Sequence, residues 1–501
     1  MGYGFVIDHT KCIGCHACTV ACKSENEVPL GAFRTWVKYT EKGTYPVVRR
    51  HFTVLRCNHC DAAPCVEICP VTALSKRPDA IVDLDRDVCI GCKACMQACP
   101  YDAIYLNEDK GVAEKCHYCA HRTEIGLEPA CVVVCPVQAI VAGDADDPET
   151  KIASLIANET TSQRKPEKET KPRVWYIDAL DDALIPGRAG EPTSWLWSDR
   201  SQPRPELPPG YEPPADLVTT LNVDHAPVWG WHVWAYLVTK NLSAGTMMLA
   251  PFLAVLGIAR GGVSGWVPEV VALVFLGLTT YLLIADLGRP ERFWRLLLKP
   301  NTKSWLVKGA WVLSVFGALT TAALGARLLG QENLADVLRW LTLPWAAFAS
   351  GYSAWLFKQC RGRDLWLESG LLWQLLLRAA FLGAGVAMLL PTVSGSPHYA
   401  AAAFISLGVL TAMGIFWERM RLHKNPDADR AESILRASFS SHEGMSLVIV
   451  AAVVVQVATS FVHVGDAVNR GVLALGLVIA LLGMLMYERA WIRAGQSVPN
   501  S

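Results

Sequence analysis

The sequence predicts an α+β domain built around four groups of cysteines, followed by an all-α bundle of eight transmembrane helices. All of the 17 cysteines except Cys360 lie between Cys12 and Cys135, and nearly all long apolar runs follow Pro227. The 501 residues exceed what one hydrophobic core usually fills, so two or three domains are expected. Lys plus Arg and Asp plus Glu both total 46, a balance that gives no indication of nucleic-acid binding. Joining a cysteine-rich half to an apolar half excludes a simple cytosolic enzyme, a disordered chain and a small disulfide scaffold.

Residues 1–141 alternate the cysteine groups with short apolar stretches such as 80–84 and 103–106, which predicts short strands and turns around buried cofactors. Each group begins with C-x2-C and ends with C-x3-C. The members are Cys12, Cys15, Cys18 and Cys22; Cys57, Cys60, Cys65 and Cys69; Cys89, Cys92, Cys95 and Cys99; and Cys116, Cys119, Cys131 and Cys135.

These spacings are typical of [4Fe-4S] clusters, which need four thiolates at the corners of a tetrahedron. A C-x2-C-x2-C loop surrounds three irons, and in two-cluster ferredoxins the fourth cysteine binds the other cluster. The groups should therefore exchange their last ligands in pairs and hold four clusters in a ferredoxin-like double domain. Two other interpretations of the cysteines fit less well. Structural zinc sites use C-x2-C pairs, which leaves the third and fourth cysteines of each group without a role. Disulfides are not expected in a reducing cytoplasm. The run 12–16 also matches the c-type haem signature, but it is embedded in a ferredoxin pattern.

Between residues 142 and 227 the composition becomes polar, charged and rich in proline. This predicts a partly ordered extension and linker. Its short apolar segment 173–177 is expected to pair with the first domain.

Residues 228–501 contain eight apolar stretches, most of them long enough to cross a bilayer at about 1.5 Å rise per residue. Trp231, Trp266, Trp305, Trp340 and Trp491 stand at their ends, as in an interfacial aromatic belt. The last stretch is marginal. The expected spans are 231–259, 267–285, 305–324, 340–357, 365–390, 399–416, 445–462 and 472–487.

Positive charge predicts the orientation of these spans. Connections on the side of the cysteine domain carry 15 Lys and Arg, in 287–304, 358–364, 417–444 and the tail, whereas the opposite connections carry four. Because cytoplasmic loops are enriched in Lys and Arg, the cysteine domain is expected in the cytoplasm of a multi-pass inner-membrane protein. The first twelve residues lack a basic and an apolar region, so no secretory signal is expected.

The sixteen cysteines resemble those of the four-cluster iron–sulfur subunit of the dimethyl sulfoxide reductase type, over residues 1 to about 200. The resemblance implies four ligand sets, in order from the catalytic partner to the membrane. They are Cys12, Cys15, Cys18 and Cys135; Cys22, Cys116, Cys119 and Cys131; Cys57, Cys60, Cys65 and Cys99; and Cys69, Cys89, Cys92 and Cys95.

The second half resembles the membrane subunits of the polysulfide reductase/NrfD family. The similarity rests on the stretches 236–245, 286–294 (DLGRPERFW) and 494–499, and it covers residues 228–501. It implies a haem-free domain that exchanges electrons with a quinone near the iron–sulfur side. The histidines agree, since His232 and His463 lie near opposite ends of their spans and His398 lies in a loop.

A quinone site needs hydrogen-bond donors in an amphipathic cleft and a route for protons. Five polar residues fall near the same ends of the first three spans and are the candidates: His232, Tyr236, Asp286, Arg289 and Lys308. Histidine suits proton exchange near neutral pH. Charged groups are costly to bury in a bilayer, so their presence there indicates a function. The alternative is that Arg289 and Lys308 extend to the headgroups and that Tyr236 packs at the interface. Arg378 lies too deep to reach the interface easily, so it is expected to face a partner or water inside the bundle, as part of a proton pathway or of a structural ion pair.

The sequence contains no dinucleotide fingerprint between a strand and a helix, no nucleophile elbow and no domain of the size that a pterin needs. A separate catalytic subunit is therefore expected, and the resemblance implies a molybdopterin oxidoreductase. The expected role is transfer of electrons between that subunit and membrane quinone. Sulfite oxidation is the leading case, and oxidation of an aromatic acyl-CoA or of formate comes close behind. The alternatives are an exported dimethyl sulfoxide, polysulfide or tetrathionate reductase, a structural anchor without a quinone site, and a proton-pumping module fed by ferredoxin or hydrogenase.

Overall fold

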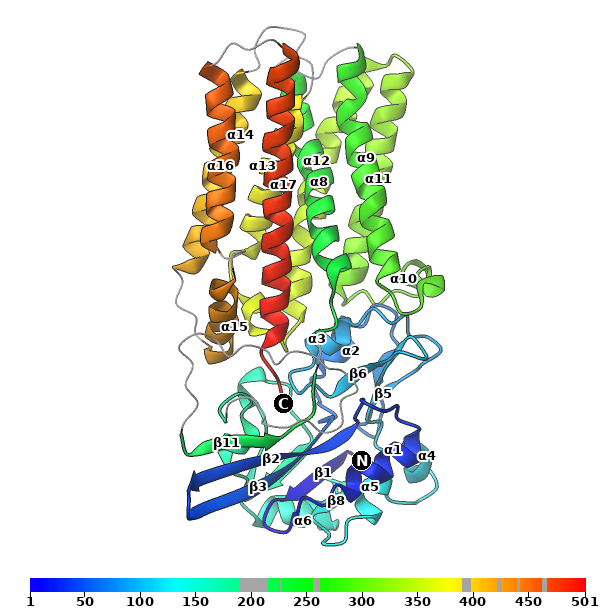
Figure 1. The fold of residues 1–501 in the computed structure, drawn as a ribbon. Coiled ribbons are helices and arrows are strands. Elements are labelled where there is room, and N and C mark those ends of the chain that lie inside the picture. The colour runs from blue at the N-terminus through cyan, green and yellow to red at the C-terminus, as the bar shows by residue number, and fades with distance from the viewer. Residues whose placement is uncertain are drawn as a thin grey trace.

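The computed structural model describes residues 1–189, 215–225, 227–255, 262–389, 398–420, 425–438, 442–461 and 466–501. A domain of short strands and helices lies at one end of a bundle of long helices (Figure 1). The C-terminal end of the chain returns to the junction between the two parts. Residues 190–214, the most proline-rich part of the expected linker, lie outside the described residues, as does His463. His398, expected in a loop, is instead the first residue of a helix, α14 (His398–Arg419).

Among the residues that the structure describes, the first domain contains four small sheets rather than one continuous layer. The largest has the strand order β8-β1-β10-β9, and a second has the order β11-β2-β3; two hairpins pair β4 with β5 and β6 with β7. The strands are β1 (Tyr3–Asp8), β2 (Thr35–Thr44), β3 (Val47–Arg56), β4 (Leu74–Lys76), β5 (Val82–Leu84), β6 (Ile104–Asn107), β7 (Val112–Lys115), β8 (Ile140–Asp144), β9 (Thr161–Ser162), β10 (Val174–Ile177) and β11 (Leu217–Leu221).

Much of the extension after residue 141 belongs to these sheets. β8 crosses the boundary placed at that residue, and β10 pairs in parallel with β1, Phe5 opposite Val174, as expected for the segment 173–177. β11 pairs with β2 at the other side of the domain. The pairing of β11 with β2 was not expected, because the composition of this region indicated a linker.

Short helices fill the spaces between the sheets. α6 begins where the Thr150 side chain accepts a hydrogen bond from the backbone N–H of Ala153. The helices of this domain are α1 (Ala17–Asn26), α2 (Pro64–Ile68), α3 (Ala94–Ala98), α4 (Ala120–Thr123), α5 (Ala130–Val133), α6 (Lys151–Asn158), η1 (Pro166–Lys168) and α7 (Asp181–Leu184).

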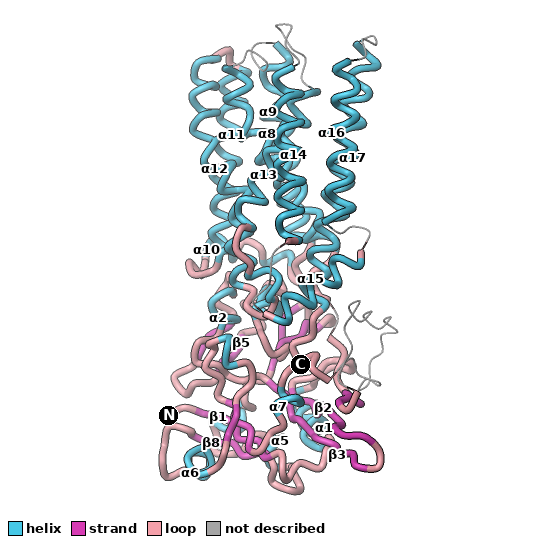
Figure 2. Tube along the Cα trace, turned by 90° about the vertical axis from the view of Figure 1, so that its left-hand side faces the viewer, coloured by secondary structure: helices cyan, strands magenta, loops and turns pink. Residues whose placement is uncertain are grey.

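The second part contains eight helices of 19–32 residues among the described ranges, side by side in Figures 1 and 2. Four of them contain segments long and apolar enough to cross a membrane: Gly265–Ala285, Trp305–Leu328, Leu371–Leu389 and Ala474–Ser497. The full helices are α8 (Trp231–Val255), α9 (Gly262–Ala285), α11 (Trp305–Leu328), α12 (Glu332–Gln359), α13 (Leu371–Leu389), α14 (His398–Arg419), α16 (His442–Phe461) and α17 (Asp466–Ser497).

Shorter helices lie at the end of the bundle that faces the first domain. They are η2 (Pro290–Arg292), α10 (Arg295–Leu298), η3 (Asp364–Leu367) and α15 (Pro426–Ala437). α15 begins at Asn425, whose side chain accepts from the backbone N–H of Asp427, and it buries one face that includes Ala428, Ala431 and Leu435. This helix was not expected from the sequence, because its buried face is short and its other residues are charged.

Candidate functional site

Two of the cysteine groups are built on the same backbone turn. In each, Cys-Ile-Gly-Cys comes before a short helix, α1 or α3. Gly14 and Gly91 both have φ of +69°, and the residues just before the helices, His16 and Lys93, have φ of +59° and +61°. Glycine adopts positive φ without steric strain, so equal spacing in the sequence gives equal turns.

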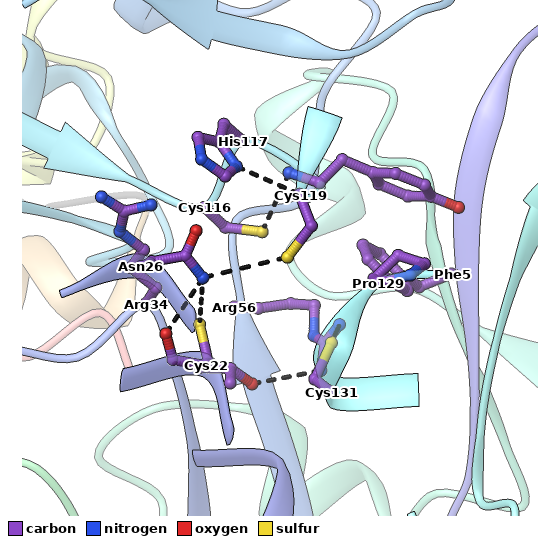
Figure 3. A pocket seen from close by; sticks show the side chains of 12 residues that line it. Phe5, Cys22, Asn26, Arg34, Arg56, Cys116, His117, Cys119, Pro129 and Cys131 are labelled. Carbon is purple, nitrogen blue, oxygen red and sulfur yellow. Dashed lines mark hydrogen bonds between the residues drawn. The ribbon is translucent and has the colours of Figure 1, made fainter. Parts of the chain in front are cut away.

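One cavity has cysteines from separate groups in its wall (Figure 3). The Nδ2 of Asn26 lies 3.6 Å from the Sγ of Cys22 and 3.8 Å from that of Cys119. The Nη1 of Arg56 donates to the Sγ of Cys131 over 3.3 Å. The four cysteines in its wall are Cys22, Cys116, Cys119 and Cys131.

A second cavity lies against α2 and has Tyr101 in its wall. Apolar groups such as Val82 and Ile104 complete the enclosure and exclude water. Its four cysteines also come from two groups: Cys57, Cys60, Cys65 and Cys99.

The remaining thiols also have neighbours from other groups. Burial raises the pKa of Cys12, and the nearby Cys135 and Cys15 raise it further. Burial likewise raises the pKa of Cys95 well above its ordinary value. The thiols that add to this shift are Cys92, Cys89, Cys69 and Cys65.

These arrangements fit the donor chemistry of [4Fe-4S] clusters: several sulfur atoms around a space walled by protein, with an amide or a cation directed at sulfur. Burial raises the pKa of Cys18 to about 12 and that of Cys119 to about 11. Such thiols lose their protons when metal binds. A bound cluster would accept and release single electrons. The assignment of ligands to individual clusters stays a prediction.

An apolar cavity lies where the bundle meets the first domain. Cys92 lines it from the first domain, and Tyr236 and Asp286 line it from the side of the helix bundle. Most of the remaining wall is aliphatic and aromatic, from α8, α9, α10, α11 and α12. Leu283, Leu287, Phe293, Leu297, Leu306 and Leu356 are among these residues.

Asp286 is the centre of a charged group at this cavity. Its Oδ1 accepts from the Nζ of Lys93 over 2.9 Å and lies 3.6 Å from the Nδ1 of His232. Burial raises the pKa of Asp286, and Lys93 opposes that shift. Lys93 was missed by the sequence reasoning; its place between Cys92 and Cys95 is the only local signal.

The other two quinone candidates lie elsewhere. The Nε of Arg289 donates to the carbonyl of Lys110 over 2.7 Å, and the backbone N–H of Arg289 donates to the carbonyl of Ile90. Lys308 places its Nζ 4.5 Å from the ring centre of Trp305. Neither residue is among those lining the apolar cavity, and His232 is not among them either but lies beside Asp286, which is.

The loop after α9 contacts the turn of the third cysteine group through backbone. The N–H of Gly288 donates to the carbonyl of Gly91, and a Cβ at Gly288 would lie 2.2 Å from the carbonyl oxygen of Gly111. Arg292 adds two hydrogen bonds of 2.9 Å, to the carbonyls of Arg86 and Cys89. Only glycine permits this approach, which accounts for the glycine at position 288 of the Asp-Leu-Gly-Arg-Pro run.

The end of α17 joins the same interface. The Oε1 of Gln496 accepts from the Nε2 of Gln97 over 2.7 Å and from the backbone N–H of Trp229 over 2.9 Å. Beyond the helix, the N–H of Asn500 donates to Asp102 over 2.8 Å. These buried hydrogen bonds hold the cluster domain against the helices.

Two buried cations in the bundle have partners. Arg378 donates to Glu488 over 2.9 Å, which supplies the partner that its depth requires. The Nζ of Lys240 donates to the carbonyl of Ser350 and to the hydroxyl of Ser353, over 2.8 and 2.6 Å.

Family models match both parts of the sequence. The model described as polysulphide reductase, NrfD, matches residues 220–500. The protein belongs to the NrfD family. Its first part matches a 4Fe-4S dicluster domain over residues 48–145 and a 4Fe-4S binding domain over residues 9–28. This NrfD-family protein therefore joins an iron–sulfur domain to a membrane domain, as the two resemblances predicted.

Relatives of the first part include proteins named as subunits of reductases. A tetrathionate reductase subunit of Salmonella typhimurium is 43% identical over 202 residues, which cover 39% of this sequence and 80% of the relative. A polysulfide reductase polypeptide of Wolinella succinogenes is 38% identical over 178 residues, 35% of this sequence and 93% of the relative. Protein NrfC of Escherichia coli K12 is 40% identical over 179 residues, 35% and 80% respectively.

Proposed function

We propose that this NrfD-family protein is the electron-transfer and membrane-anchor subunit of a molybdopterin oxidoreductase, and that it passes electrons between a separate catalytic subunit and membrane quinone. The observation that carries the proposal is that Cys92 and Asp286 line the same apolar cavity. A cofactor ligand thus shares a wall with a polar group able to exchange protons. The apolar remainder of the cavity suits a lipid-soluble ring.

The proposed path uses four [4Fe-4S] clusters in the order implied by the resemblance. Neighbouring thiols support that order, because a thiol in each of the first three sets interacts electrostatically with a thiol of the set that follows. The three pairs that link successive sets are Cys18 with Cys131, Cys57 with Cys116, and Cys65 with Cys95.

Quinone reduction takes up two electrons and two protons, and the side chains at the cavity have separate roles in the proposal. Asp286 and His232 hold and transfer protons, since they lie within 3.6 Å of each other. Lys93 keeps Asp286 in place and supplies positive charge beside the ring. The hydroxyl of Tyr236 is the proposed donor to a quinone oxygen. Arg289 and Lys308 then act at the interface rather than on the quinone.

We further propose that all eight long helices span the inner membrane and that the iron–sulfur domain faces the cytoplasm. The 15-to-4 distribution of Lys and Arg supports this orientation. It favours an intracellular substrate, with sulfite as the leading case. An exported reductase is the second candidate, because relatives are named as parts of tetrathionate and polysulfide reductases.

An epitope tag at the N-terminus tests the orientation, since Met1 is 75% exposed. We expect antibody to reach the tag in inverted membrane vesicles but not in intact spheroplasts. A cytoplasmic marker protein serves as the control for leaking spheroplasts. Labelling of intact spheroplasts alone would favour the exported reductase.

The cluster assignment is tested by metal analysis of the anaerobically purified protein. Sixteen thiolates at four per cluster predict about sixteen irons per chain. Purification of its complex should also yield a large molybdenum-containing subunit. Zinc in place of iron would contradict the proposal, and a complex without molybdenum would favour the module fed by ferredoxin or hydrogenase.

A further inference from the structure

We propose that Arg56 is a charge-tuning residue whose buried guanidinium raises the reduction potential of the centre held by Cys22, Cys116, Cys119 and Cys131. The inference rests on the proposed function, in which these four thiols bind one cluster. It concerns a residue that binds no iron and touches no quinone.

Arg56 is a buried cation at the end of β3. Its side chain has no exposure to solvent, and its guanidinium lies 4.3 Å from the ring centre of Phe5. Nη1 donates to Cys131 over 3.3 Å and Nη2 donates to Thr35 over 3.2 Å, while Nε has no hydrogen-bond partner. Within the described ranges, no carboxylate forms an ion pair with it. The groups whose negative charge would offset it are cysteine thiolates: Cys131 and Cys116 of this set, and Cys18 of the neighbouring set.

Arg34 lines the same cavity but, unlike Arg56, forms an ion pair with a carboxylate (Figure 3). It is also deeply buried, but its Nη2 lies 2.9 Å from the carboxylate of Glu114. This ion pair reduces the positive field that Arg34 exerts on the cavity. Lys115, a third buried cation nearby, donates to the carbonyls of Val82 and Cys116 rather than to a carboxylate. Of these three cations, Arg56 is the one whose N–H donates to a thiol of this set.

Reduction of the centre adds one electron and no proton, and no bond forms or breaks. The electron comes from a chemical reductant in a titration and from the catalytic subunit in the proposed complex. Since the added charge is negative, a fixed cation in a medium of low dielectric constant stabilises the reduced state more than the oxidised state. A hydrogen bond to the ligand sulfur acts in the same direction. The potential of this centre is therefore raised relative to one without Arg56.

The test is a redox titration of the anaerobically purified full-length protein, followed by electron paramagnetic resonance. The signal lost in Cys131→Ala identifies the centre. Arg56→Gln removes the charge but keeps an amide donor, and we expect its midpoint potential to shift to a lower value. Arg56→Lys keeps the charge and should shift it less. Arg50→Gln is the matched control, because Arg50 lies on the same strand with its side chain 52% exposed, and it should leave the potential unchanged.

Thr35→Asp provides a second variant in case Arg56→Gln loses the cluster. It places a carboxylate beside Nη2 and should lower the potential while Arg56 remains. An unchanged potential in a variant that keeps sixteen irons would overturn the inference, as would equal shifts in Arg56→Gln and Arg56→Lys. Loss of the centre in both Arg56→Gln and Thr35→Asp would make Arg56 an assembly residue and would also overturn it. Absence of any cluster in the wild type would instead contradict the proposed function.

Discussion

Cys92→Ala is expected to abolish electron transfer to quinone while leaving the other centres reducible. Cys92 lines the apolar cavity, and its thiol belongs to the proposed cluster nearest the membrane. Removing this ligand should lower the iron content from about sixteen to between about twelve and fifteen atoms per chain. Quinone reduction by the purified protein should then fall to the background rate, because the last carrier before the cavity is damaged. Iron analysis and a quinone-reduction assay on one preparation measure both effects.

The matched control is Cys360→Ala. Cys360 is also fully buried near the same interface, but it is outside the four groups and its Sγ lies 3.6 Å from the carbonyl of Leu356. This variant should keep both its iron and its quinone activity. Equal quinone activity in Cys92→Ala and the wild type would show that electrons leave by another route.

Asp286→Asn is expected to lower the rate of quinone reduction on the order of 100-fold, the contribution typical of a general acid or base. The substitution removes the carboxylate that pairs with Lys93 and lies beside His232. It preserves the side-chain shape, so the interface and the iron content should be retained. Steady-state quinone reduction, with iron measured in parallel, checks this result.

Glu291→Gln removes a nearby carboxylate outside the cavity. Its side chain is 59% exposed and lies 3.6 Å from Arg289, and we expect activity close to that of the wild type. If both variants lose activity equally, the effect of Asp286 reflects the general charge of the interface rather than proton transfer.

The cysteine turns and the long helices could be predicted from the sequence, because they depend on local spacing and periodicity. The cysteine groups repeat within a few residues, so their turns, such as those at Gly14 and Gly91, follow from the local pattern. Apolar runs likewise located the long helices, although their ends moved by several residues. α12, for example, begins at Glu332 rather than at residue 340, because its first turns are polar.

Contacts between distant segments were not predictable in this way. Lys93 and Asp286 are 193 residues apart, and Gln97 and Gln496 are 399 apart. Their pairing depends on how the two domains meet, which no local pattern encodes. Arg56 stands beside Cys57 in the sequence, but its hydrogen bond goes to Cys131. The sequence could therefore indicate the cofactor type, but not which side chains surround each centre.

Reoxidation of the reduced iron–sulfur centres by quinone would show whether electrons pass from the clusters to a lipid-soluble carrier. The purified full-length protein would be reduced anaerobically, freed of reductant, and mixed with a short-chain quinone while its iron–sulfur absorbance is followed. The account predicts rapid reoxidation with one quinol formed for every two electrons released, and slow reoxidation in Asp286→Asn. Centres that stay reduced in the wild-type protein after quinone is added would contradict it.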